Sequence, residues 1–184
     1  QKLAEKSKMT LLIFATGSGK LANVALVFDD GSGTTNFADN ALSRFKFMNA
    51  GSDLQSADVL IDGSVTLANI PFGSQSSYGS ISAGDRNVKI QASGTPGAYL
   101  YDQAQTFGAA YDYSLVAYSV AGTGAVSTFA LQDNNIPPAS GKAKLRVVNA
   151  SSDSTVYDTY VNYSKFLSAV VQATGSAYQE LDSG

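Results

Sequence analysis

The sequence predicts an all-β protein made of immunoglobulin-like antiparallel β-sandwich repeats, one complete and two partial. Short stretches in which polar and apolar residues alternate recur at roughly the 8–12-residue spacing typical of sandwiches, with Gly, Pro and Asp residues between them. Gly, Ser, Thr, Val and Tyr are abundant, and no stretch has a convincing helical period. One segment also occurs twice, which indicates tandem units.

The repeated segment sets the organisation of the chain. It reads RFKFMNAGSD at 44–53 and returns as KLRVVNASSD at 144–153, 100 residues later. The same spacing continues without a gap as far as Gly84 and Gly184. A second alignment, with a spacing of 104, places 9–30 over 113–134. The chain is therefore predicted to start inside one repeat and to end inside another.

These alignments divide the chain into five parts. The predicted parts are a closing strand hairpin of a partial repeat at 1–30, a linker at 31–42, a complete sandwich repeat at 43–134, a proline-containing linker at 135–142 and the opening strands of a partial repeat at 143–184.

The first predicted element is a hairpin. Residues 10–16 and 21–28 are compact apolar runs, and the Gly17-Ser-Gly19 turn joins them. The polar residues 1–8 before them open the first strand or fray. The Gly/Ser/Thr-rich stretch after the hairpin is typical of a linker.

About eight strands are expected in the complete repeat. The dipeptide Asp62-Gly63 tolerates positive φ at both positions and therefore predicts a tight hairpin between the strands on either side of it. The predicted strands are 45–48, 58–61, 65–70, 77–82, 87–92, 99–107, 113–120 and 126–131. Pro137 and Pro138 stiffen the linker that follows.

Composition excludes several classes of function. The 184 residues carry a net charge of −3, which disfavours binding to nucleic acid or to anionic membranes. No apolar run approaches the ~20 residues of a membrane-spanning helix. The chain contains no Cys and no His, so thiolate sites and His-based catalysis are absent. We therefore expect no enzyme activity and no cofactor. The low-charge, Cys-free composition suits a secreted or cell-surface protein.

Two groups of residues resemble binding sites in composition, but turns explain both groups better. Gly17-Ser-Gly19-Lys20 is similar to a phosphate loop, but Phe14 and Leu21 stand where that loop needs Gly and Ser or Thr. Several acidic residues offer calcium-type oxygen ligands, but their spacing fits no calcium loop. Two of them recur in the second copy, which favours side-chain capping of turns. The acidic residues concerned are Asp29, Asp30, Asp53, Asp58 and Asp62, with Asp153 and Asp158 as the recurring counterparts.

Tyrosines and two asparagines complete the set of candidate residues. Asn149 and Asn162 are glycosylation sequons in form, although Asn149 lies inside the repeated segment, which favours a chance match. Most tyrosines are expected to fill strand faces, with an exposed subset able to stack on a sugar or a partner protein. The tyrosines concerned are Tyr99, Tyr101, Tyr111, Tyr113, Tyr118, Tyr157, Tyr160 and Tyr163.

The order of motifs resembles a known family. The motif Val148-Asn-Ala-Ser-Ser-Asp153, the hairpin sequence DVLIDG at 58–63 and the strands that run into Ala-Gly are similar to a domain-of-unknown-function family of tandem immunoglobulin-like repeats in secreted and surface proteins of bacteria and archaea. That family typically reads VNASPDA and then VDVYVDG. Here Ser152 replaces the proline, and Asn162-Tyr163 replaces Asp-Gly. The resemblance implies the fold and brings no catalytic residues.

The two partial repeats predict self-association. Each has an apolar face and open strand edges, and ~30–40 residues bury too little core to be stable alone. The C-terminal part of one chain and the N-terminal strands of another are therefore expected to share a sandwich, so that a homo-oligomer grows head to tail as an extracellular filament. The predicted interface residues are Leu11, Ile13, Val24, Leu26, Leu145, Val147, Val161, Leu167 and Tyr178.

Three alternatives stay open at the level of sequence. The two partial repeats can pair within one chain, the chain can be a fragment of a tandem-repeat cell-surface adhesin, or it can be a module that binds a glycan or a surface protein. The sequence identifies neither a source nor a ligand.

Overall fold

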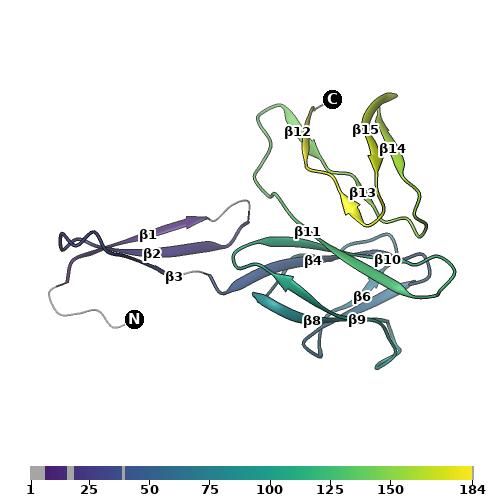
Figure 1. The fold of residues 1–184 in the computed structure, drawn as a ribbon, viewed down its shortest axis with the longest axis horizontal. Coiled ribbons are helices and arrows are strands. Elements are labelled where there is room, and N and C mark those ends of the chain that lie inside the picture. The colour runs from purple at the N-terminus through teal and green to yellow at the C-terminus, as the bar shows by residue number, and fades with distance from the viewer. Residues whose placement is uncertain (1–6, 16–18, 39, 184) are drawn as a thin grey trace.

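The computed structural model describes residues 7–15, 19–38 and 40–183, and it is all-β, as predicted. Figure 1 shows a narrow N-terminal sheet, a central sandwich and a group of C-terminal hairpins beside the sandwich. Among the described residues, no helix is long and apolar enough to span a membrane.

Two four-stranded sheets form the central sandwich. The first sheet has the order β11-β10-β4-β7, and its strands are β4 (Leu42–Ala50), β7 (Gly79–Ser82), β10 (Asp112–Ser119) and β11 (Val126–Gln132). The second sheet has the order β6-β5-β8-β9, and its strands are β5 (Ser56–Ile61), β6 (Ser64–Pro71), β8 (Gly84–Ala92) and β9 (Tyr99–Phe107). The strands of each sheet alternate between a buried and a more open face.

One pairing in the sandwich is parallel. Strand β10 runs parallel to β4, with Asp112 opposite Arg44 and Tyr118 opposite Ala50. All the other ladders are antiparallel. Parallel neighbours require a long crossover, which here consists of everything between β4 and β10. The first strand of the domain is therefore completed by a strand from its far end.

Aromatic side chains dominate the core between the two sheets. Phe45 and Phe47 on β4 are fully buried, and so are Phe107 and Leu115. The Phe45 and Phe107 rings lie 5.8 Å apart, and Tyr113 meets Phe107 edge to face at 5.5 Å. Because buried positions alternate along β4, Arg44, Lys46 and Met48 project to its opposite, outer face.

The hairpin predicted at Asp62-Gly63 is confirmed. Strands β5 and β6 pair around it, with Ile61 opposite Ser64. Asp62 has φ 50° and Gly63 has φ 81°, the left-handed region that this dipeptide favours.

The N-terminal sheet contains a strand that the sequence did not predict. Strands β1 (Met9–Ala15) and β2 (Ala22–Phe28) form the expected hairpin, whose turn at 16–18 lies outside the described residues, as do 1–6. Strand β3 (Thr35–Ala38) then pairs with the free edge of β2, inside the range 31–42 that was expected to be a linker. Phe37 of β3 meets Phe14 of β1 edge to face at 6.4 Å, which helps to hold the strand there.

The C-terminal part consists of three two-stranded pairings. Its strands are β12 (Lys142–Leu145), β13 (Val148–Asn149), β14 (Tyr157–Val161), β15 (Ser164–Val170), β16 (Thr174–Gly175) and β17 (Gln179–Asp182). Strand β12 pairs with β17, β13 with β16 and β14 with β15. The last of these pairs turns through Asn162 and Tyr163, both with positive φ, at the place where the family pattern has Asp-Gly.

Two phenylalanine truncations test this assignment of the core. Phe47→Ala removes a ring that is 0% exposed and is expected to lower the free energy of unfolding by roughly 3–5 kcal/mol. Phe37→Ala, at a ring that is 67% exposed, is expected to cost no more than about 1.5 kcal/mol, the value of one aromatic contact. Urea denaturation followed by circular dichroism measures both variants. Equal losses would contradict the placement of the core at Phe47.

Candidate assembly interface

The C-terminal strands reproduce the opening strands of the sandwich. Strands β12 and β17 pair Lys142 with Asp182 and Leu145 with Gln179. Strands β4 and β7 pair Leu42 with Ser82 and Phe45 with Gly79, which is the same register 100 residues earlier. The hairpins β5-β6 and β14-β15 also share two register shifts, one on each side of Val59 and one on each side of its counterpart Thr159.

A buried asparagine explains why the repeated segment recurs. The Nδ2 of Asn49 donates to the carbonyls of Leu54 and Ile70, and its Oδ1 accepts from Gly51 N. Asn149 makes the same three bonds, to Thr155, Val170 and Ser151. A buried amide with all of these bonds satisfied fixes the turn between the two sheets.

The two sequons occupy different environments. Asn149 is 7% exposed, and its amide is held by the bonds of the turn, so its role is structural. Asn162 lies in the exposed turn between β14 and β15.

The N-terminal strands reproduce the closing strands of the sandwich. Strands β1 and β2 pair Met9 with Phe28, and β10 and β11 pair Tyr113 with Gln132, which is the same register 104 residues later. Thr10 Oγ1 donates to Asp29 Oδ2 at 3.1 Å. Its counterpart Ser114 Oγ donates to the equivalent carboxylate, Asp133 Oδ2, at 2.8 Å.

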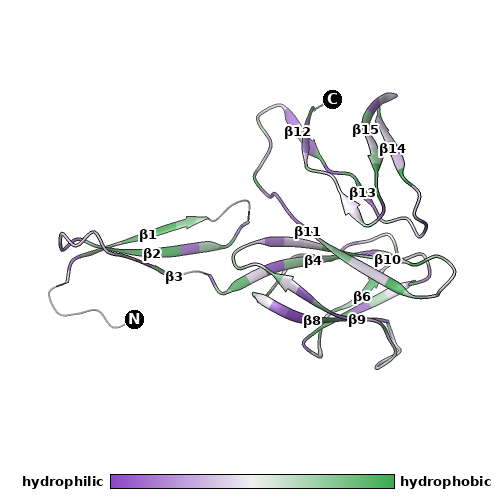
Figure 2. Cartoon of the chain, viewed as in Figure 1, coloured by the Kyte–Doolittle hydropathy of each residue, from purple (hydrophilic) through white to green (hydrophobic). Residues whose placement is uncertain are grey.

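The N-terminal strands lack the cover that their counterparts have. Leu115 and Ala117 on β10 are both 0% exposed, packed in the sandwich beside Phe45 and Phe47. The equivalent residues on β1, Leu11 and Ile13, are 56% and 69% exposed. Figure 2 shows β1 and β2 as apolar strands that stand away from the sandwich. An exposed apolar strand of this kind marks an interaction surface.

Most of the predicted interface residues lie on two matching surfaces. Leu11 pairs with Leu26 and Ile13 with Val24, so these four side chains share one face of the N-terminal sheet. On the C-terminal part, Leu145 is exposed and Val147, between β12 and β13, is half-buried. Val161 on β14 and Leu167 on β15 are also half-buried, and these strands correspond to β5 and β6 of the sandwich.

Tyr178 lies elsewhere. Its ring stacks on Lys144 at 4.9 Å and on Arg146 at 4.7 Å. Tyr78 occupies the equivalent position against Arg44 and Lys46. Lys144 and Arg146 alternate with Leu145 and Val147, so Tyr178 lies on the outer face of the C-terminal strands at 142–182, here called the half-repeat, and not on the face of Leu145 and Val147.

Two of the cavities that border the half-repeat bear on its proposed pairing. The inner cavity, of about 310 Å³, is lined by Val147, Asn149, Tyr157, Thr159 and Val170 among others. The outer cavity, of about 730 Å³, lies between the half-repeat and the first sheet of the sandwich, and its lining includes Met48, Phe72, Val116, Val148 and Ala150. Both cavities have largely apolar walls.

A buried carboxylate ties the half-repeat to the sandwich. Asp133 accepts from Ser114 Oγ, from the Tyr78 hydroxyl and from Arg146 Nη2, the last at 2.6 Å. Both members of the Asp133–Arg146 pair are nearly inaccessible to solvent. Gly175 also lies so close to Leu131 that an added Cβ would come within 2.7 Å of its side chain. These contacts hold the half-repeat against the first sheet.

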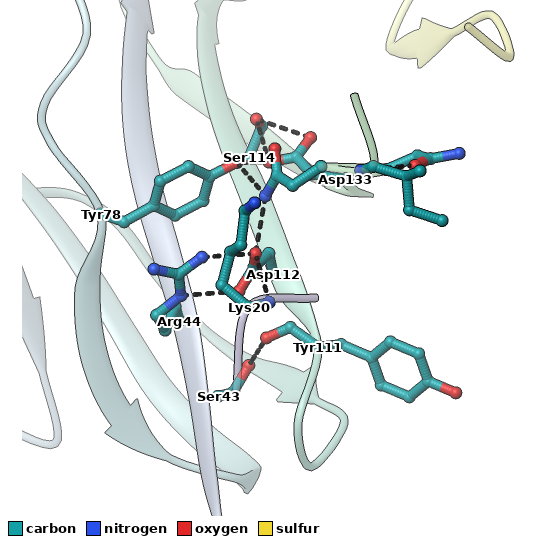
Figure 3. Close-up of polar contacts among 11 residues, drawn as sticks. Lys20, Ser43, Arg44, Tyr78, Tyr111, Asp112, Ser114 and Asp133 are labelled. Atoms are coloured by element: carbon teal, nitrogen blue, oxygen red, sulfur yellow. Dashed lines mark hydrogen bonds and ion pairs between the residues drawn. The ribbon is translucent and has the colours of Figure 1, made fainter. Parts of the chain in front are cut away.

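A second buried carboxylate lies beside the first. Figure 3 shows Arg44 reaching Asp112 with two bonds, from Nε at 2.8 Å and from Nη2 at 2.6 Å. Asn135 Nδ2 donates to the same carboxylate at 2.6 Å, and the Lys20 backbone N–H donates to it at 3.2 Å. Asp112 therefore joins β4, β10, the connection between β1 and β2, and the segment that leaves the sandwich.

The environments of these groups shift their titration. Burial acts to raise the pKa of Asp112, but the hydrogen bonds from Arg44 and Asn135 and the charge of Arg44 outweigh it and hold the pKa below its ordinary value. Burial and the bond to Asp133 raise the pKa of Tyr78. Burial likewise raises the pKa of Tyr178.

The acidic residues considered as calcium ligands serve separate turns. Asp58 Oδ1 accepts from Asn69 N, and Asp158 Oδ1 accepts from Ala169 N, both at 2.9 Å. Asp62 binds Arg86 and the Asn87 backbone N–H. Within the described ranges, no three acidic residues are grouped as they would be to hold a metal ion.

Sequence reasoning missed the two buried carboxylates. Asp112 opens one strand and Asp133 follows another, each as an unremarkable polar residue. The available signal for Asp133 was its recurrence as Asp29 at the spacing of 104. Asp112 has Lys8 as its counterpart, so the repeat gave no signal for it.

Comparison with known proteins gives one family. The sequence model of the family described as Domain of unknown function (DUF4397) matches residues 43–156, which cover the whole central sandwich and the first strands of the half-repeat. No curated protein matches the sequence.

Acidification tests the role of Asp112. Because the pKa of Asp112 is lower in the folded chain than in the unfolded chain, its contribution to stability is complete above about pH 4 and is lost as the pH falls through the folded-state value. Between pH 5 and pH 2, the urea midpoint of the native protein is expected to fall more steeply than that of Asp112→Asn.

Asp158→Asn is the matched control for this experiment. In the native chain, Lys165 lowers the pKa of Asp158, just as Arg44 lowers the pKa of Asp112. Both Asp158 and Lys165 are exposed, however, so solvent weakens their interaction. Identical acid profiles for native protein and Asp112→Asn would show that Asp112 does not couple folding to pH.

Proposed function

We propose a function from the two partial repeats, because the chain belongs to the family described as Domain of unknown function (DUF4397) and a fold alone prescribes no chemistry. The proposed function is that of a secreted structural protein that assembles head to tail into an extracellular filament. The C-terminal half-repeat of one chain is completed by the N-terminal strands of the next. Each composite sandwich then joins two complete ones.

One observation carries this proposal. The terminal strands keep the ladder registers of the central sandwich, at spacings of 100 and 104 residues, although each lacks the partner that its counterpart has. In the sandwich, the two equivalent pieces are held together by the parallel pairing of β10 with β4. The same pairing between chains would cover Leu11 and Ile13 and the open face at Leu145 and Val147.

The arrangement of the parts favours pairing between chains. Figure 1 shows the N-terminal sheet extending from one end of the sandwich along its long axis, while the C-terminal hairpins lie beside the sandwich and apart from β1. The surfaces that meet are different patches of the molecule, so the contact is heterologous. A heterologous contact that does not close into a ring propagates as a filament.

The location outside the cell is supported by composition and by motif order. The chain has no Cys and few charges, and its motifs resemble those of tandem immunoglobulin-like repeats in secreted and surface proteins. A sheet that adds a strand from another chain is also a known mode of recognition, in which main-chain hydrogen bonds give affinity and side-chain pockets give specificity.

A second candidate function rests on exposed tyrosines. Tyr160 and Tyr163 lie in the β14-β15 hairpin and are exposed, and so is Tyr157, the first residue of the same hairpin. Aromatic rings in the open suit a module that binds a glycan or a surface protein, as in a tandem-repeat adhesin. Reproducible hits on a glycan array, lost in Tyr160→Ala/Tyr163→Ala, would favour this function over the filament. An array without hits would argue against the glycan form of it.

Ile13→Asp tests the filament. Ile13 is 69% exposed, so the isolated chain is expected to fold as before, whereas a charge at the shared core should weaken association at least about tenfold, the equivalent of about 1.4 kcal/mol. Light scattering and electron microscopy of the full chain measure association, and thermal unfolding at low concentration measures folding.

Val65→Asp is the control, because Val65 is 58% exposed on β6 of the central sandwich, away from the proposed interface. A chain without residues 1–30 should stay monomeric. If the intact and truncated chains are equally monomeric and equally stable, the filament proposal fails.

A further inference from the structure

We propose that β1 of the incoming chain binds by both of its faces, and that its outer face occupies the outer cavity of the acceptor chain. Leu11 and Ile13 enter the shared sandwich, while Leu12 and Phe14 enter the space between the acceptor's half-repeat and its central sandwich. The inference rests on the proposed function and adds the register of the pairing and a second docking surface.

The register follows from the pairing inside the sandwich. There, Tyr113 lies opposite Phe45, Val116 opposite Met48 and Tyr118 opposite Ala50. The spacing of 104 converts these β10 residues to Met9, Leu12 and Phe14, and the spacing of 100 converts the β4 residues to Leu145, Val148 and Ala150. Between chains, Met9 therefore lies beside Leu145, Leu12 beside Val148 and Phe14 beside Ala150.

Alternation along the repeated segment identifies the faces of the half-repeat. Asn149 is buried as Asn49 is, which places Val147 on the same inner face, whereas Val148 and Ala150 correspond to the outer face of β4. Val148 borders both cavities, and Ala150 lines the outer cavity, opposite the first sheet of the central sandwich. Side chains alternate along a strand, and directly paired residues share a face. Leu12 and Phe14 consequently project toward the outer cavity.

The sequence of β1 fits burial on two sides. Leu11, Leu12, Ile13 and Phe14 are consecutive apolar residues, whereas a strand with one wet face alternates apolar and polar residues. Leu12 and Phe14 are nevertheless 48% and 38% exposed in the isolated chain. Val116, the counterpart of Leu12, faces away from the sandwich core and is buried all the same.

The outer cavity fits two large apolar side chains. Its volume of about 730 Å³ lies in the range of pockets that enclose a ligand, about 300–1,000 Å³. Met48, Phe72 and Val116 form apolar walls, and Phe72 is an exposed aromatic residue that this occupant would cover. Because Asp133 and Arg146 hold the half-repeat against the sandwich, the cavity exists before the strand arrives.

Engineered cysteines test the register in the full chain, which has no native cysteine. Leu12→Cys combined with Val148→Cys is expected to give disulfide ladders between chains on non-reducing gels. Leu12→Cys combined with Ala150→Cys is two residues, about 6.6 Å, out of register and should cross-link far less, since a disulfide needs Cβ atoms about 3.5–4.5 Å apart. Filaments that cross-link through the second pair and not the first would overturn the register.

A double-mutant cycle tests the second face. Leu12→Ser on the donor strand and Phe72→Ser on the cavity wall are each expected to weaken association several-fold, and the double variant should lose less than the product of the two losses, because the groups touch each other. Thermal unfolding at low concentration reports whether each variant folds.

The outcomes separate the two proposals. Association that is insensitive to Leu12→Ser and Phe72→Ser but abolished by Ile13→Asp would leave the filament standing and overturn the second docking face. If the losses of association in the two single variants multiply fully in the double variant, the second docking face is also overturned. If the native chain itself does not associate, the proposed function fails first.

Discussion

The parallel pairing of β10 with β4 is the constraint from which the rest of the structure follows. It joins the first strand of the sandwich to a strand about 70 positions later, so the domain is not closed until its last hairpin arrives. Among the described residues, neither β1 nor the strands from β12 to β17 have a parallel partner of this kind. The buried core of Phe45, Phe47 and Leu115 depends on this one ladder. The terminal halves have the strands of such a ladder without the ladder itself.

Repetition made much of the fold predictable. The repeat spacings of 100 and 104 residues correspond to equal pairing registers in the repeated strands. The Asp62-Gly63 turn and the β1-β2 hairpin also lie where the sequence pattern predicted them. Strand β3 was missed because its short Thr-Asn-Phe-Ala sequence has no counterpart in the other repeats, and only the free edge of β2 organises it. The role of Asn149 in fixing its turn could not be predicted, because the two carbonyls that it binds belong to residues 6 and 21 positions further along the chain, Thr155 and Val170.

The surfaces proposed for assembly could be predicted only in part from the sequence. The apolar character of β1 and β2 follows from their continuous apolar runs, whereas the apolar faces of β12 and β14 follow from alternation. The stacking of Tyr178 on Lys144 and Arg146 could not be predicted, because it depends on two cations from a segment about 30 residues earlier in the chain. The Asp133–Arg146 pair joins two parts of the chain through charges that are ordinary in sequence. Tertiary contacts of this kind leave no periodic signal.

Strand β3 has a mechanical consequence for the proposed filament. Without β3, the donor chain would leave the junction at Phe28, which lies opposite Met9. That is the end of the junction at which the acceptor strand begins, at Lys142. Tension would then act on both chains at the same end and would break the hydrogen bonds of the ladder one at a time. Strand β3 reverses the exit to Ala38, level with Val24 and Ile13, where Asn40 is tied to Asn23 and Ala22. Tension then pulls the two chains from opposite ends of the shared sheet. The hydrogen bonds of the junction are loaded together in shear, which is the arrangement that a fibre under load requires.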